Sequence, residues 1–210
     1  HRDLHSFPTR RSSDLLVKHN IKPLCFFNFG TRDLYTRNKA VKTPADSAGL
    51  KIRVQPVAIY TELVKSMGGQ PTPMPWPEVY SALSQGVIDS AEAPPNAIID
   101  QKHFEAAKFY MKTNHILDAS VVVMSLRAFN ALNAEQKKTL ESEANAACDW
   151  MTEESNKVYD SSVAELEKRG MTIVTDVDRT AFEKSAESIQ KAFPAWSPNL
   201  VADIRKQLGR

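Results

Sequence analysis

The sequence predicts a mixed α/β fold, because segments with strand-like and helix-like patterns alternate along most of the chain. In GLKIRVQ (49–55), apolar and polar residues alternate with the period of two that is typical of a half-buried strand. The next segment, 57–67, carries apolar residues at helical spacing and stops at two glycines. A much longer helix is expected over 134–169, where it begins after a capping-box pattern and ends at Gly170.

Shorter elements are expected around these three. The expected strands lie at 24–29, 87–91, 120–125 and 171–175, and the expected helices at 77–85, 96–107 and 179–192. The polar segment 31–48 is expected to be a loop. The run SVVVMS at 120–125 is continuously apolar, as in a buried strand. Arg53 lies on the polar side of its strand, so its side chain should point away from that strand's core.

The composition excludes two classes of protein. The chain has 210 residues, 42% of them hydrophobic and 25% charged, and contains no apolar run long enough to cross a bilayer. The net charge of only +2 is spread without a basic block, so the chain carries no electrostatic footprint for nucleic acid. This length accommodates one or two domains.

The two cysteines, Cys25 and Cys148, have no metal-binding spacing. They are compatible with one disulfide, two free thiols or two buried apolar side chains, and the last is the default for isolated cysteines. Neither a nucleotide-binding loop nor a catalytic or metal-binding motif occurs, so we expect no cofactor, no metal and no enzymatic activity.

Three residues could contact a ligand: Arg53, Arg32 and Trp76, which stands between two prolines. Each also has an ordinary structural explanation. An exposed arginine commonly forms a weak surface ion pair, and a tryptophan commonly packs in a core. The residue pattern alone therefore supports only an α/β domain.

Three blocks of sequence resemble the periplasmic solute-binding proteins of TRAP transporters, the tripartite ATP-independent periplasmic transporters of the DctP family. These blocks are GLKIRVQ at 49–55, MGGQPTPMPWPEVYSALSQGVIDSAEAP at 67–94 and KFYMKTNHI at 108–116. The resemblance implies a two-lobed α/β fold of the periplasmic-binding-protein type, with one long helix spanning both lobes. One lobe would be largely present in this chain and the other truncated.

The resemblance also assigns roles to single residues. Arg53 matches the arginine that forms a two-pronged ion pair with the ligand carboxylate, a geometry that suits a planar guanidinium. Arg32, in FGTR, matches a second arginine at the same end of the ligand, and Trp76 matches an aromatic residue that lines the cleft. Ala93 departs from the pattern, because many members carry an asparagine there whose amide holds the carboxylate. Gln55 is an alternative polar contact beside Arg53.

The implied function is transport without chemistry. The protein would capture an organic carboxylate in the periplasm and deliver it to the transporter's membrane subunits, with an ion gradient driving uptake. Two alternatives are a ligand-sensing domain that signals to a partner and an α/β enzyme that acts on a small acid.

The expected organisation has four parts. Residues 16–118 would form the substrate-binding lobe, 119–158 the remnant of the truncated lobe with the spanning helix, and 159–210 the return to the first lobe with a C-terminal tail. Residues 1–15 contain three arginines and no apolar stretch, and positions 5–15 read as the translation of a common sequencing adapter. We therefore expect 1–15 to be foreign, and about a hundred residues with a secretion signal to precede Leu16 in the parent gene.

Deleting residues 1–15 should leave the fold and its thermal stability unchanged, because this segment contributes no apolar periodicity to a core. Thermal unfolding of the chain with and without the segment measures this directly. A drop in melting temperature on deletion, or burial of Phe7 and Leu15, would contradict the prediction.

Overall fold

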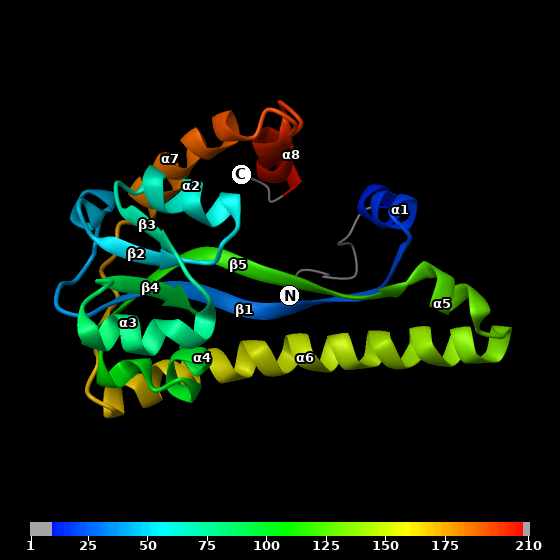
Figure 1. The fold of residues 1–210 in the computed structure, drawn as a ribbon, viewed down its shortest axis with the longest axis horizontal. Coiled ribbons are helices and arrows are strands. Elements are labelled where there is room, and N and C mark those ends of the chain that lie inside the picture. Colours follow the sequence, from blue (N-terminus) through cyan, green and yellow to red (C-terminus); the bar gives the residue numbers. More distant parts are fainter. Residues whose placement is uncertain (1–9, 208–210) are drawn as a thin grey trace. The chain divides into compact units, whose positions relative to one another are not determined.

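The computed structural model describes residues 10–207, and contacts between residues divide the chain into two compact units (Figure 1). Unit 1 comprises residues 10–32 and Ile116–Ala164, and unit 2 comprises Asp33–His115 and 165–207. Three long elements contribute residues to both units: β1 (Ile21–Thr36), β5 (Phe109–Ser125) and α6 (Ala134–Lys168). The α/β class predicted from the sequence is confirmed.

Six strands within the described residues form one sheet in the order β3-β2-β4-β1-β5-β6. Its four short strands are β2 (Lys51–Val54), β3 (Gln70–Pro73), β4 (Ser90–Ala93) and β6 (Thr172–Val174). Strand β2 runs parallel to both of its neighbours, whereas β1 pairs with β4 in antiparallel register, with Asp33 opposite Ala93. Strand β2 therefore has a neighbour on either side, and its middle residues lie well inside the sheet.

Helices cover both faces of this sheet in unit 2. Figure 1 shows α2 (Ala58–Ser66) and α7 (Arg179–Ala186) over one face, with α3 (Val79–Gln85) and α4 (Pro95–Asp100) over the other. The shorter helical turns of unit 2 and its last helix are η2 (Pro44–Ser47), η3 (Trp76–Glu78), η4 (His103–Glu105), η5 (Glu187–Ala192) and α8 (Leu200–Gln207). The main apolar core lies beneath α2 and α7. Its members are Leu34, Val41, Ile52, Val54, Val64, Met67, Met111, Val174 and Phe182.

The two glycines that were expected to end the helix at 57–67 do so by different means. Gly68 follows α2 with φ +80°, a left-handed conformation that favours glycine. A Cβ on Gly69 would lie 2.7 Å from Cδ1 of Ile52, so the chain can approach the core this closely only without a side chain. Together they turn the chain from α2 into β3.

Unit 1 is held together by a disulfide and by polar contacts. Cys25 of β1 and Cys148 of α6 form a disulfide across 123 residues, so the default expectation of two unbonded, buried cysteines is wrong. Nζ of Lys22 lies 2.6 Å from a carboxylate oxygen of Glu141, and the backbone N–H of Asn28 donates to the Thr152 hydroxyl. The remaining helices of this unit are α1 (Arg10–Lys18) and α5 (Leu126–Ala131).

The segment expected to be foreign lies partly outside the described residues. Positions 1–9, which include Phe7, are not described, whereas residues 10–15 begin α1. Leu15 is 58% exposed and belongs to no core.

Helix α6 begins where the sequence predicts and ends one residue earlier. At its start, the backbone N–H of Asn133 donates to the Gln136 side chain and that of Gln136 donates to the Asn133 side chain, the reciprocal pattern of a capping box. Among the described residues, no helix is both long enough and apolar enough to cross a membrane.

Two expectations about strands are wrong. Residues 31–36 continue β1 instead of forming a loop, because their polar side chains are buried and bonded within the sheet; Asp33, for example, accepts a hydrogen bond from Tyr110. The apolar run at 120–125 is a strand, yet Val121, Val122 and Val123 are 38–46% exposed. Apolar composition alone does not determine which strands are covered.

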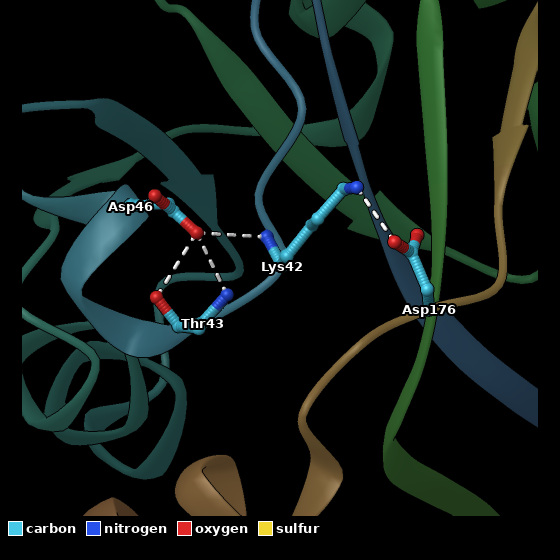
Figure 2. Close-up of polar contacts among 4 residues, drawn as sticks. All are labelled: Lys42, Thr43, Asp46 and Asp176. Carbon is cyan, nitrogen blue, oxygen red and sulfur yellow. Dashed lines mark hydrogen bonds and ion pairs between the residues drawn. The ribbon is translucent and has the colours of Figure 1, made fainter.

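The loop between β1 and β2 is fixed by a carboxylate (Figure 2). Oδ2 of Asp46 accepts hydrogen bonds from the backbone N–H groups of Lys42 and Thr43 and from the Thr43 hydroxyl, at 2.8–3.0 Å. Those from Thr43 come first among the causes that lower the pKa of Asp46. The Lys42 side chain reaches the segment before α7, where its ammonium lies 2.6 Å from Asp176.

Reducing the Cys25–Cys148 disulfide should destabilise the protein by about 2 to 4 kcal/mol, because the bond closes a long loop in the unfolded chain. Thermal unfolding with and without a thiol-free reductant measures the effect. The double variant Cys25→Ala/Cys148→Ala serves as control and should be insensitive to the reductant. Equal stability of the oxidised and reduced forms would contradict the prediction.

Replacing Asp46 by alanine should cost about 1 kcal/mol at neutral pH, because three donors lose their shared acceptor. Since the folded-state pKa of Asp46 is lowered, its stabilisation is present above the unfolded pKa near 4 and is lost as the pH falls through the folded value. The deficit should therefore shrink in acid. Asp176→Ala, which removes an exposed ion pair, is the matched control and should cost clearly less stability than Asp46→Ala.

Candidate functional site

Arg53 lies in the middle of β2, on the face opposite the apolar core. Ile52 and Val54 belong to the core beneath α2, and the alternation of the strand turns Arg53 to the other side. That side is covered too, because Arg53 is only 2% exposed. The expectation of a half-buried strand is therefore wrong at this position, since helices pack on both faces of the sheet.

The guanidinium of Arg53 has a fixed orientation. Its Nε and Nη2 donate to the carbonyl oxygen of Met74 at 3.1 and 2.9 Å. Met74 is itself tied to the strand, because its N–H donates to the Val54 carbonyl. The Arg53 Cζ lies 5.2 Å from the ring centroid of Trp76, within the range of a cation–π interaction. The structure thus brings together two of the residues that the sequence singled out.

Trp76 belongs to an aromatic cluster within unit 2. The aromatic cluster consists of Tyr35, Trp76, Tyr80 and His103. The His103 ring lies 4.7 Å from that of Trp76, 5.8 Å from that of Tyr35 and 6.4 Å from that of Tyr80, measured between centroids. The Tyr80 hydroxyl donates to Glu105 at 2.6 Å, which fixes the outer side of the cluster.

His103 is fully buried, and its hydrogen-bonding groups are unevenly satisfied. Nδ1 lies 2.7 Å from the hydroxyl oxygen of Tyr35, whereas Nε2 has no hydrogen-bond partner among the described residues. Burial, and after it the positive charge of Arg53, lowers the pKa of His103 to about 4. The ring is therefore neutral at pH 7.

The other predicted residues have separate surroundings. Arg32 belongs to unit 1, is 5% exposed and forms an ion pair with Asp118 at 3.1 Å. Gln55 follows β2 directly and is half-buried. Ala93 is buried at the end of β4, opposite Asp33 of β1. Their roles in binding remain predictions.

Sequence reasoning missed Tyr35 and His103. The two residues are 68 positions apart, and no motif links them. The sequence pattern gives His103 no role, because its surroundings depend on how η4 packs against Trp76. A lone histidine carries no sequence signal that would reveal a tyrosine partner on another element.

The described residues contain no metal cluster, and the pocket in unit 2 lies apart from the predicted binding residues. No group of three or more His, Cys, Asp or Glu side chains in residues 10–207 is placed to hold a metal ion. A pocket of about 410 Å³ lies in unit 2 between α2, α7 and β5, lined among others by Met67, His115, Arg179 and Phe182. None of the predicted binding residues lines it.

Comparison with known proteins points to one family. Residues 6–195 match the model of the DctP family, described as bacterial extracellular solute-binding protein, family 7. This match begins inside the segment that was expected to be foreign. Among curated proteins, the 2,3-diketo-L-gulonate-binding periplasmic protein YiaO of Escherichia coli is 34% identical over 166 residues, which are 77% of this chain and 49% of that protein.

Solved structures give the same result. A TRAP periplasmic solute-binding protein from Actinobacillus succinogenes with bound L-galactonate has a TM-score of 0.90 and 35% identity, covering 98% of this chain and 68% of that chain. One from Fusobacterium nucleatum with bound sn-glycerol 3-phosphate has a TM-score of 0.90 and 32% identity, covering 97% and 66%. The matched proteins are solute-binding proteins, not enzymes. The chain spans about half the length of the curated relatives that it matches.

Proposed function

Since the chain belongs to the DctP family of bacterial extracellular solute-binding proteins, we propose that the intact protein captures a sugar acid through the guanidinium of Arg53. The observation that carries this proposal is the fixed, buried guanidinium beside Trp76. A planar fork held by the Met74 carbonyl is ready for a carboxylate without further ordering, which lowers the entropic cost of binding.

The environment of Arg53 strengthens such an ion pair. An interaction between opposite charges grows as the surrounding dielectric falls, and Arg53 is 2% exposed. Trp76 is half-buried and offers an apolar face next to the guanidinium, which suits the carbon skeleton of a sugar acid.

The ligand class follows from relatives with bound or named ligands. Their ligands include 2,3-diketo-L-gulonate, L-galactonate and β-D-galacturonate, all sugar acids, and one relative holds sn-glycerol 3-phosphate. Ala93 supplies no amide to a ligand, so we propose that selection for the carboxylate depends on arginine. Arg32 and Gln55 are proposed as further polar contacts.

The proposed setting is the periplasm. Curated relatives are named as periplasmic binding proteins. We propose that the loaded protein delivers its ligand to the membrane subunits of a TRAP transporter and performs no chemistry on it. Binding and a closed state would then stabilise each other.

Arg53→Lys should weaken binding of the sugar acid about tenfold to a hundredfold, because lysine keeps the charge but loses the two-pronged geometry and a charge-assisted hydrogen bond. A thermal-shift screen of uronates, aldonates and keto acids first identifies the ligand. Isothermal titration of both proteins, expressed from the unbroken genomic locus, then measures the affinities.

A control is needed because Arg53 is buried, so its substitution can also lower the stability of the protein. Because Arg53→Lys also disturbs contacts with Met74 and Trp76, some loss of stability is expected. Asp46→Ala should also lose stability, through a loop outside the proposed contacts, and should bind with unchanged affinity. Equal affinities of the parent protein and Arg53→Lys would refute the role of Arg53.

A further inference from the structure

The aromatic cluster connects Arg53 to a residue that has no assigned role. His103 packs at 4.7 Å against the indole ring that lies 5.2 Å from the Arg53 Cζ. The indole of Trp76 thus neighbours both the guanidinium and the imidazole. Whatever fixes the histidine ring therefore limits where the indole can lie.

A residue of β1 fixes the position of the His103 ring. Its Nδ1 lies 2.7 Å from the Tyr35 hydroxyl oxygen, and both residues are fully buried. Buried aromatic rings packed at native density have little freedom to move without opening a void. Tyr35 thus links the position of the histidine ring to the central strands of the sheet.

The charge state of His103 follows from the same packing. Protonation would place a hydrogen on both ring nitrogens, and Nε2 has no acceptor among the described residues. The surrounding titratable and charged groups are Arg53 on β2, Tyr35 on β1, Tyr80 on α3 and Glu105 on η4. Glu105 is bonded to Tyr80. Burial, and after it the positive charge of Arg53, favours the neutral ring.

We propose that His103 is a positioning residue: its ring, anchored by Tyr35, holds Trp76 in place and through it the guanidinium of Arg53. This inference rests on the proposed function for its effect on ligand binding. Its effect on the guanidinium does not depend on any ligand. The two parts can therefore be measured separately.

The ligand-free test follows hydrogen exchange of the Arg53 Nε–H, which donates to the Met74 carbonyl, by nuclear magnetic resonance of the full-length protein. His103→Ala should accelerate this exchange severalfold. Tyr35→Phe/His103→Phe should restore slow exchange, because it keeps two packed rings and removes both members of the hydrogen-bonded pair together. His103→Phe alone should lie in between, since it leaves the Tyr35 hydroxyl without His103.

The binding test uses L-galactonate and D-galacturonate as probes. His103→Ala should weaken the affinity threefold to tenfold, the size expected of one aromatic contact, and the double phenylalanine variant should recover most of it. If His103 were merely structural, His103→Ala would lower the melting temperature. It would leave the affinity for the acid and the exchange of the Arg53 Nε–H unchanged.

A third measurement reports the electrostatic coupling between Arg53 and His103. The pKa of His103, followed through its ring proton, should be about 4 in the ligand-free protein and should rise when Arg53→Gln removes the positive charge. Arg53→Lys keeps the charge and is the control, so its His103 should keep a low pKa. A bound carboxylate should also raise the pKa of His103, because it offsets the charge of Arg53.

The outcomes separate the two proposals. If neither acid nor any other member of the screen binds the parent protein, the proposed function fails, and the exchange and pKa measurements alone decide the role of His103. If His103→Ala leaves exchange and affinity unchanged, or if the double phenylalanine variant is as impaired as His103→Ala, the positioning role is refuted.

Discussion

The buried guanidinium of Arg53 is the constraint on which the site in unit 2 depends. A cation that is 2% exposed has lost most of its hydration, and the protein must replace that solvation with fixed dipoles and nearby π-systems. The Met74 carbonyl and the face of Trp76 contribute to this replacement. Burial, and after it this positive charge, lowers the pKa of the neighbouring His103 and keeps its ring neutral.

The two faces of the sheet in unit 2 carry different sets of side chains. The face beneath α2 and α7 carries the apolar core, including Ile52 and Val54, and Gly69 allows the chain to pass close to it. The opposite face carries Arg53 and the aromatic cluster. Because both sets of side chains alternate along the same short strands, packing of the core also fixes the orientation of Arg53.

Unit 1 is stabilised in a different way. The disulfide between Cys25 and Cys148 and polar pairs such as Arg32–Asp118 connect its segments, while Val121–Val123 remain considerably exposed. In unit 1, covalent and polar links between residues more than eighty positions apart thus contribute to stability, while some of its apolar side chains stay exposed. The same cysteines carried no sequence signal that distinguished a disulfide from two buried thiols.

The α/β class, the position of the long helix α6 and the membership of the DctP family could be inferred from the amino-acid sequence. The same sequence also singled out Arg53 and Trp76 as candidate residues. These properties depend on residues a few positions apart, such as the Asn133–Gln136 cap, or on contiguous blocks of sequence. The three-dimensional structure was needed to find that Arg53 is buried and that residues 31–36 continue β1. It was also needed to find that His103 contacts Tyr35 and Trp76. Such contacts join elements far apart in the chain, and their existence depends on which helix covers which face of the sheet, a choice that no local pattern encodes.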